Sequence, residues 1–404
     1  MATLAATASF AQSSVTLYGN LDQSIFRAKS DAGFLLSSNS NAGSTSLWGI
    51  TGSEDLGGGT KASFDLKSEL TLLNGTTGSA TTGVNTAGSS NAATPAPYES
   101  NANVFNRGAN IAVANAGLGE LKIGRQNDAW WETTTKFNNT GINSYGWANA
   151  TAMVSGTNSL NLLYGGNPLT TVGGLVVSGA SATAGVGANT GATNTGTVGT
   201  GGAFFGGLSY ATPVVAGFQG KIAKGAPKAA YTQTGDANNI ASYSLNYSNG
   251  PLTAAWARQN RTDAAAADAL RQTMFAVKYV TGPYTLTYGN NAARVGGTAV
   301  STDLAHNADV NAIGFGYTVN PSWTVDVGYT VVKDKDTTTN KWTQTGVVGK
   351  YALSKRTTWY VGYGRSANDG SARYGSIYGG SANAIPAVAG TNESNFITGL
   401  RHSF

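Results

Sequence analysis

The chain has 404 residues, of which 41% are hydrophobic and 11% are charged, and its formal net charge is +5. No stretch approaches the roughly 20 apolar residues that a membrane-spanning helix requires, and the glycine-rich, weakly charged composition leaves little for a soluble packed core. Cysteine is absent, which excludes disulfides, and no Lys/Arg cluster accompanies the basic surplus to indicate a nucleic-acid partner.

The first residues resemble the end of a secretory signal. A short apolar run from Leu4 to Phe10 is followed by polar residues, and the small side chains of Ser9 and Ala11 fit a cleavage site. No Lys or Arg precedes the run. We expect residues 1–11 to be a signal-peptide remnant and residues 12–404 to form the mature domain; a disordered tail is the alternative for the first segment.

Apolar and polar residues alternate along most of the remaining chain. In residues 239–249, for example, Ala241, Tyr243 and Leu245 interleave with serines and an asparagine, so a strand there has one apolar and one polar face. This pattern marks sixteen segments, at 14–26, 44–54, 59–71, 103–115, 118–126, 203–212, 214–224, 239–249, 251–260, 272–281, 283–291, 309–319, 322–333, 341–353, 356–366 and 394–404. With lipid against the apolar face and water against the polar face, the sequence predicts an all-β, antiparallel transmembrane β-barrel.

The connections between these segments alternate in length. Short turns stand at residues such as 57–59, 249–251 and 282–283, whereas long polar connections occupy 72–102, 127–156, 261–271, 292–308 and 367–393. Short periplasmic turns and long extracellular loops are typical of outer-membrane barrels. Residues 74–97 and 179–202 are of low complexity and are expected to be mobile. Segments 158–164 and 175–178 could add a hairpin, which leaves eighteen strands as the alternative to sixteen.

A series of short motifs runs along the chain from its first predicted strand to its last. They are Ser13–Gly19, Gly52–Phe64, Gly119–Arg125, Tyr210–Pro213 with Gly217-Phe218, Asn249–Leu252, Leu353–Thr357 and Gly399–Phe404. Together they resemble the trimeric general porins of Gram-negative outer membranes, in the form typical of beta-proteobacteria. The resemblance covers the chain from end to end and leaves only the low-complexity inserts unmatched.

The resemblance implies a homotrimer of sixteen-stranded barrels in the outer membrane, each with its own water-filled channel. It implies that the third long loop, about residues 126–156, folds into the barrel and narrows the pore; a surface loop is the alternative. It also implies that the terminal Phe404 is read by the barrel-assembly machinery. The chain departs from the family where Leu47 and Gly108 replace arginines of many relatives, so selectivity cannot be carried over.

Strand alternation predicts which charged side chains face the lumen. Setting Phe64, Leu66 and Leu70 toward lipid turns Lys61, Asp65, Lys67 and Glu69 inward, and a charge facing lipid near mid-membrane costs about 2 to 4 kcal/mol. The same reasoning assigns to the lumen the basic residues Lys61, Lys67, Lys122, Lys221, Lys278, Lys350 and Arg401, and the acidic residues Asp22, Asp65, Glu69, Glu120 and Asp326. The alternative for each residue is that it forms a neutralising ion pair, which only makes the barrel wall more rigid. Seven basic against five acidic side chains predict a weak preference for anions.

The candidate pore-lining or constriction residues are Lys61, Asp65, Lys67, Glu69, Lys122, Arg125, Asp128, Trp130, Trp131, Glu132, Lys350 and Arg401. We expect a passive channel for small hydrophilic solutes and ions, with outer-membrane lipid and lipopolysaccharide as further partners. One alternative is a sugar-type porin in which Trp130, Trp131, Tyr145 and Trp147 form an aromatic slide. Another is a barrel scaffold whose loops 72–102 and 367–393 bind a partner as an adhesin. His306 and His402 are the only histidines and have no partner at metal-ligand spacing, so we expect neither a metal, nor a cofactor, nor an enzyme.

Overall fold

The computed structural model describes residues 14–31, 33–73, 75–77, 104–147, 204–225, 239–263, 266–295, 306–336, 339–372, 374–375 and 389–404. The expected signal-peptide remnant at residues 1–11, the stretch 179–202, most of 74–97 and the possible hairpin in 158–178 lie outside these residues. Across the described part of the chain, no helix is long and apolar enough to cross a membrane.

The described elements are almost all strands. They are β1 (Ser14–Ser30), β2 (Gly33–Ser40), β3 (Leu47–Gly57), β4 (Thr60–Thr71), β5 (Thr76–Thr77), β6 (Gly108–Asn115), β7 (Gly119–Asn127), α1 (Ala129–Thr134), η1 (Thr135–Phe137), β8 (Phe204–Ala211), β9 (Phe218–Gly225), β10 (Asn239–Asn249), β11 (Leu252–Asp263), β12 (Ala266–Thr281), β13 (Tyr284–Val295), β14 (His306–Asn320), β15 (Trp323–Asp334), β16 (Lys341–Ala352), β17 (Thr357–Asp369) and β18 (Glu393–Ser403).

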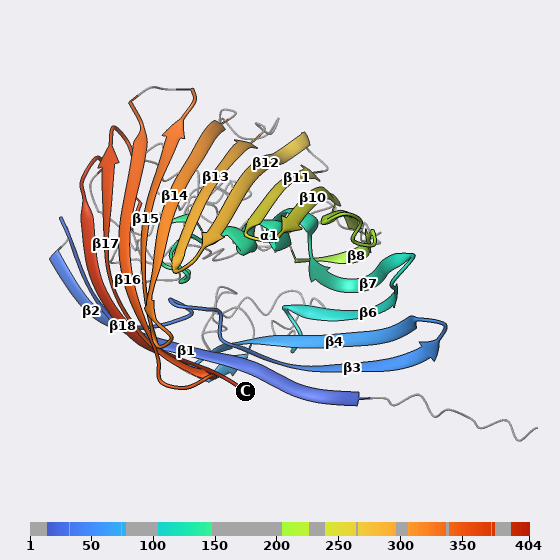
Figure 1. Ribbon diagram of the computed structural model, residues 1–404. Coiled ribbons are helices and arrows are strands. Elements are labelled where there is room, and N and C mark those ends of the chain that lie inside the picture. The colour runs from blue at the N-terminus through green and yellow to red at the C-terminus, as the bar shows by residue number, and fades with distance from the viewer. Residues whose placement is uncertain are drawn as a thin grey trace, which may run out of the picture.

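Sixteen long strands pair antiparallel with their neighbours and close into one barrel (Figure 1). The ring closes where β1 meets β18, from Asn20 opposite Ser403 to Lys29 opposite Ser394. Phe404 extends this seam, because its backbone exchanges two hydrogen bonds of 3.0 Å with Gly19. Two further strands are not counted among the sixteen. β2 pairs with β1 on the same side as β3, and β5 has only two residues. The prediction of sixteen strands is therefore confirmed.

The second barrel strand differs from the predicted segment 44–54. β2 pairs with the later half of β1 and β3 with its first half, so residues 41–46 leave the sheet between them. We call residues 41–46 the insert. The sequence conceals β2 because Ser37 to Ser46 is rich in Ser and Asn and shows no apolar alternation; only Phe34 and Leu36, both exposed on the outer face, signal a strand.

The predicted long connection at 261–271 was also wrong. β11 continues to Asp263 and β12 begins at Ala266, and the two pair with each other almost to their ends. The alanine-rich sequence of this region lacks the alternation that marks a strand. This region forms strands because it pairs with its neighbours; the local sequence preference alone would not predict them.

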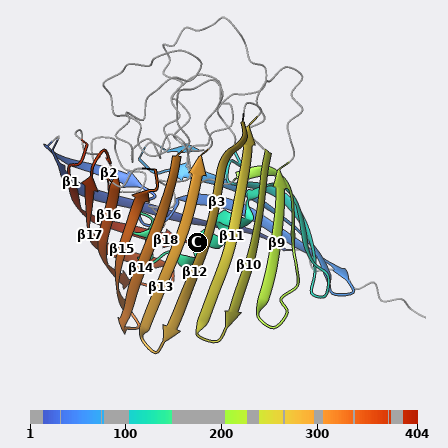
Figure 2. The same cartoon turned by 90° about the horizontal axis from the view of Figure 1, so that it is seen from above.

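The short turns lie together at one edge of the ring (Figure 2). Between β3 and β4, three consecutive glycines, Gly57, Gly58 and Gly59, have φ values of +81°, +59° and +75°. Only glycine adopts this left-handed conformation at three successive positions without strain. The turn leads directly into a strand, as the sequence predicted.

After β7 the chain turns into the barrel instead of away from it. We call residues 128–147 the inner segment; it contains α1 and η1, and Figure 1 shows α1 within the ring of strands. Its far end meets the insert, where Asn143 N donates to Gly43 O at 3.1 Å and Ser144 N to Ala42 O at 3.0 Å. The inner segment thus crosses the interior from β7 to the wall formed by β1 and β2.

A row of glycines lies beneath the inner segment. Gly314, Gly328, Gly346 and Gly364 stand directly opposite one another on β14, β15, β16 and β17. A Cβ atom at Gly328 would lie 2.6 Å from the Thr140 methyl group, and one at Gly346 would lie 2.6 Å from Tyr145 Cβ. These distances are too short for any side chain, so glycine is required for the segment to approach the wall this closely.

This close approach predicts a large difference between two glycines of the same strand. Gly346→Ala should force Tyr145 away from β16 and cost about 1 to 3 kcal/mol, the usual range for overpacking. Gly349→Ala is the matched control, because its Cβ would meet Trp323 and Val361 at 3.6 Å, an ordinary contact on the outer face. Urea unfolding of both variants in detergent measures the difference. Equal stability of the two variants would show that the inner segment does not press on this wall.

Candidate functional site

The start of the inner segment is held by a buried aspartate. Asp128 caps α1 by accepting a hydrogen bond from Trp131 N at 2.7 Å, and its second oxygen accepts one from Gln259 Nε2. Ala129 N donates to Ser242 Oγ at 2.9 Å. Asp128 is fully buried by these contacts. Asp128 therefore belongs to the inward-folded segment without lining the lumen, and its carboxylate fixes α1 to β10 and β11.

Hydrogen bonds through amide side chains hold the middle and the end of the inner segment against β14 and β16. Gly146 N donates to Gln344 Oε1 at 2.6 Å, and Gln344 Nε2 returns a bond to Ser144 O at 3.3 Å. Asn139 Nδ2 donates to Ile313 O at 2.9 Å. Because these partners lie on β14 and β16, the segment is fixed to the wall at both ends and along its middle.

Three of the four aromatic candidates are buried between the inner segment and the wall. Trp130 and Tyr145 have no exposed surface, and Trp147 is 1% exposed. Trp147 Nε1 donates to Thr134 O at 3.1 Å, which ties the two ends of the segment together. Trp131 alone is partly exposed. Trp130 therefore belongs to the inward-folded segment but does not line the lumen, because its apolar ring is covered by packing.

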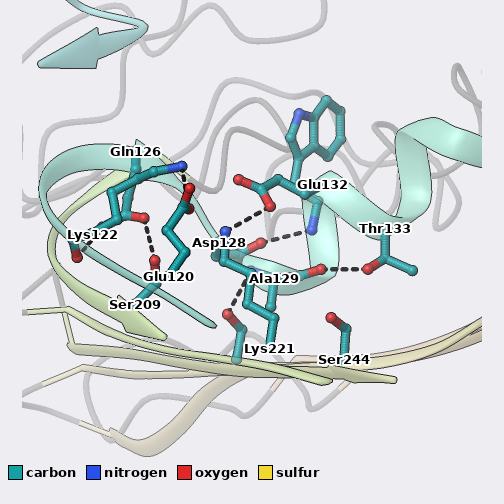
Figure 3. A network of polar contacts seen from close by, with 12 residues as sticks. Glu120, Lys122, Gln126, Asp128, Ala129, Glu132, Thr133, Ser209, Lys221 and Ser244 are labelled. Carbon is teal, nitrogen blue, oxygen red and sulfur yellow. Dashed lines mark hydrogen bonds and ion pairs between the residues drawn. The ribbon is translucent and has the colours of Figure 1, made fainter. Parts of the chain in front are cut away.

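Charged side chains gather where α1 and η1 face β9, β10 and β12. Glu132 and Lys221 form an ion pair of 2.6 Å, which Figure 3 shows beside the capping Asp128. Lys136 Nζ donates to Asn246 Oδ1 at 3.3 Å, and Lys278 Nζ donates to Lys136 O at 3.1 Å. Burial lowers the pKa of Lys136; Lys221 and Lys278 lower it further, whereas Glu132 opposes them.

Most other inward-facing charges form local pairs. Lys67 lies 3.2 Å from Asp65, Lys122 lies 3.0 Å from Glu120, and Lys350 lies 2.6 Å from Asp326. Asp65 also accepts a hydrogen bond from Tyr18. Lys61 is exposed on β4, and Arg401 is close enough to Asp22 to attract it electrostatically. The pairs reduce, without removing, the field that each basic residue contributes.

Two further candidate residues do not line the open lumen. Glu69 is buried, where it accepts hydrogen bonds from Arg107 Nε at 2.7 Å and from Asn41 Nδ2 at 2.9 Å in the insert. Arg125 pairs in register with Ala109, on the strand face that carries exposed Ile111 and Ile123. Strand alternation therefore places Arg125 on the outer face, and its Nε donates to Asn106 O.

The charge balance inside the barrel is more basic than the sequence indicated. Asp22 and Glu69 are buried, and the inner segment contributes Lys136 and Glu132. Among the described strands and the inner segment, the inward charges that are not buried are eight basic residues, Lys61, Lys67, Lys122, Lys136, Lys221, Lys278, Lys350 and Arg401, and three acidic ones, Asp65, Glu120 and Glu132, because Asp326 is buried as well.

The wall residues that anchor the inner segment were not identified from the sequence. Alternation could have placed Ser242, Gln259 and Gln344 on the inner face, opposite Tyr243, Trp256 and Val347. It could not have identified their partners, which lie 113, 131 and 198 residues away along the chain.

Comparison with solved structures finds the same architecture in several outer-membrane proteins. An anion-selective porin from Comamonas acidovorans shares 19% identity over 97% of this chain and 100% of its own, with a TM-score of 0.69. OmpT of Vibrio cholerae in its trimer form shares 13% over 97% and 99%, with a TM-score of 0.60. OmpF of Salmonella typhi in complex with daunomycin shares 12% over 96% and 97%, with a TM-score of 0.55.

No curated protein matches the chain. The match to known families is nevertheless extensive, because residues 1–371 fit the family described as Gram-negative porin. With a closed antiparallel barrel of sixteen strands around an inward-folded segment, the chain belongs to the Gram-negative porins, the channels of the outer membrane.

Proposed function

We propose that the protein is a passive channel for small hydrophilic solutes and ions, narrowed by its inner segment. The observation that carries this proposal is the inner segment itself, which crosses the barrel while Thr135 and Lys136 remain exposed within it. Water therefore reaches side chains beside the segment. A rigid crossing that leaves water on its surface restricts the size of a solute without blocking the path.

We further propose a weak preference for anions. Among the described residues, eight basic and three acidic side chains face the interior without being buried, and a basic surplus in a narrow passage raises the local concentration of anions. The structural similarity to an anion-selective porin supports the same direction. Since most lysines are paired with carboxylates, we expect the preference to be modest.

Reversal potentials across a planar bilayer under a KCl gradient test this preference. We expect chloride to be favoured at low salt and the preference to fade as salt rises, because the Debye length falls from about 8 Å at physiological strength to about 3 Å at 1 M. A clear preference for potassium at low salt would contradict the proposal.

No described contact favours the alternative functions. A sugar slide would require exposed aromatic rings, whereas Trp130, Tyr145 and Trp147 are buried. Most of the loops 72–102 and 367–393, on which an adhesin would depend, lie outside the described residues. The family consists of channels rather than enzymes.

We propose that the protein assembles as a homotrimer through the outer face of β1 to β7. Tyr and Trp concentrate at membrane–water boundaries, and from β8 onward the exposed outer face carries many of them, among them Tyr243, Trp256 and Tyr329. From β1 to β7 the exposed large apolar residues are aliphatic except for Phe34. A face without an aromatic girdle fits contact with another copy better than contact with lipid.

A matched pair of substitutions tests this assignment. Ile111→Lys on β6 should break the trimer, because it places a charge in the proposed contact, whereas Ile313→Lys on β14 should leave the trimer intact. The mass of each variant in detergent gives the oligomeric state. If both variants remain trimers, the outer face of β1 to β7 is not the trimer contact. If both dissociate, the added charge disrupts the trimer wherever it is placed, and this face is not specific.

Basic residues on the outer face suggest where lipopolysaccharide binds. Six strands, β1, β9, β11, β13, β15 and β17, end at the edge of the barrel opposite the short turns. Each carries one basic residue near this end: Arg27, Lys224, Arg258, Arg294, Lys333 and Arg365. Strand alternation aligns each with the outward apolar residues. Phosphate groups of the outer leaflet would meet this ring, and mass spectrometry of bound lipid after purification tests it.

We propose that Phe404 acts both in barrel closure and as a signal to the barrel-assembly machinery. Deleting it removes two backbone bonds to Gly19 and a ring that lies against Gly19, a loss of roughly 1 to 3 kcal/mol. Refolding in detergent should therefore be nearly normal, while the amount in the outer membrane of cells should fall sharply. Phe404→Tyr, which keeps the aromatic end, is the control.

The two assays separate the roles of Phe404. A similar loss in both would mean that the residue acts through stability alone. No loss in either would contradict its part in closing the barrel.

A further inference from the structure

Three lysines from different elements converge on one face of the inner segment. Lys221 comes from β9, Lys278 from β12 and Lys136 from η1. Their amines are connected through the segment, because Lys221 bonds Glu132 and Lys278 bonds the backbone oxygen of Lys136. Glu132 and Lys136 are four residues apart in the helical region, so they lie on the same face.

The inner segment brings these amines together. β9 and β12 are three strands apart in the barrel, about 14 Å at about 4.8 Å per strand, and Lys278 lies four residues beyond Met274, the residue of β12 that is level with Lys221. Both lysines reach toward the inner segment, which passes between them, and Asn246 on the intervening β10 bonds Lys136 at 3.3 Å. The group is therefore a built cluster from four elements and not a run of surface lysines.

The cluster has more positive charge than its partners neutralise. Glu132 is the one carboxylate that the described residues pair with these three lysines. Desolvation is the main cause of the lowered pKa of Lys136; Glu132 opposes it, and repulsion by Lys221 and Lys278 adds to it. Lys136 remains exposed, so a dissolved anion can reach it. Ammonium groups at such a place supply charged hydrogen-bond donors that suit an oxyanion.

We propose that Lys136, Lys221, Lys278 and Asn246 form a binding site for small oxyanions, of which inorganic phosphate is the simplest probe, and that this site sets the anion preference of the channel. The inference rests on the proposed channel function and deepens it by locating the selective residues on the β9–β12 side. A passage needs a site weak enough to release its ion, and solvated lysines partly balanced by Glu132 meet that requirement.

Phosphate titration of the chloride current through single channels tests the site. In the unchanged protein, phosphate should reduce the chloride current by occupying the cluster. Lys136→Gln combined with Lys278→Gln should weaken this block and lower the chloride-to-potassium permeability ratio by about fourfold. This follows because one unit charge about 8 Å from an ion in water, screened over a Debye length of about 8 Å, changes the local concentration of that ion about 1.4-fold, and each of the two lost charges acts on chloride and on potassium in opposite directions. Glu132→Gln removes the negative charge of the cluster. It should therefore strengthen the phosphate block and raise the chloride-to-potassium permeability ratio.

Lys61→Gln combined with Lys67→Gln is the matched control, because it removes the same charge from the opposite wall on β4. It should retain the phosphate block. Equal block in the unchanged protein and the Lys136/Lys278 variant, or equal loss in both double variants, would overturn the site. If phosphate blocks through the cluster while the unchanged channel prefers potassium, the proposed preference fails and the control of selectivity by this site fails with it. A channel that prefers chloride but shows no effect of the Lys136/Lys278 change would refute the site alone.

Discussion

Close contact between the inner segment and the inner wall is the constraint on which the rest of the structure depends. Four glycines in register across β14 to β17 let the segment approach to van der Waals distance, and a side chain at any of them would push it away. Glycine weakens strand interiors, so this row costs sheet stability. The cost is offset by burial of Tyr145, whose ring lies over Gly346 and Gly364, and by burial of Trp130 and Trp147 elsewhere under the inner segment.

Polar contacts determine where along the wall the segment lies. Its backbone amides at Ala129 and Gly146 donate to Ser242 and Gln344, and Asp128 joins Gln259 to the start of α1. These groups would be costly to bury without partners, so they favour one position over a slipped one. The insert completes the arrangement, because its backbone oxygens accept bonds from the far end of the segment. A channel narrowed in this way keeps a fixed passage, and the charges on the segment keep fixed positions relative to the wall.

The sequence predicted the barrel well because strand alternation is a local signal that repeats at every strand. It placed Lys61, Lys67 and Lys122 on the inner face for the same reason. It failed where structure depends on distant partners: β2 is rich in Ser and Asn, and its pairing with β1 decides its conformation. Asp128 and Trp130 could equally have faced water, and only packing against β10 and β11 buries them. Arg125 was assigned to the pore because it is basic, but the alternation of β7 places it on the outer face of the barrel.

Hydrogen–deuterium exchange of the purified protein in detergent tests the central claim most directly. If the inner segment is docked, peptides covering residues 129–147 should exchange nearly as slowly as the strands, because their amides donate to Ser242, Gln344 and the insert. Fast exchange throughout these peptides, with the strands still protected, would show that the segment moves freely inside the barrel and would contradict a fixed constriction.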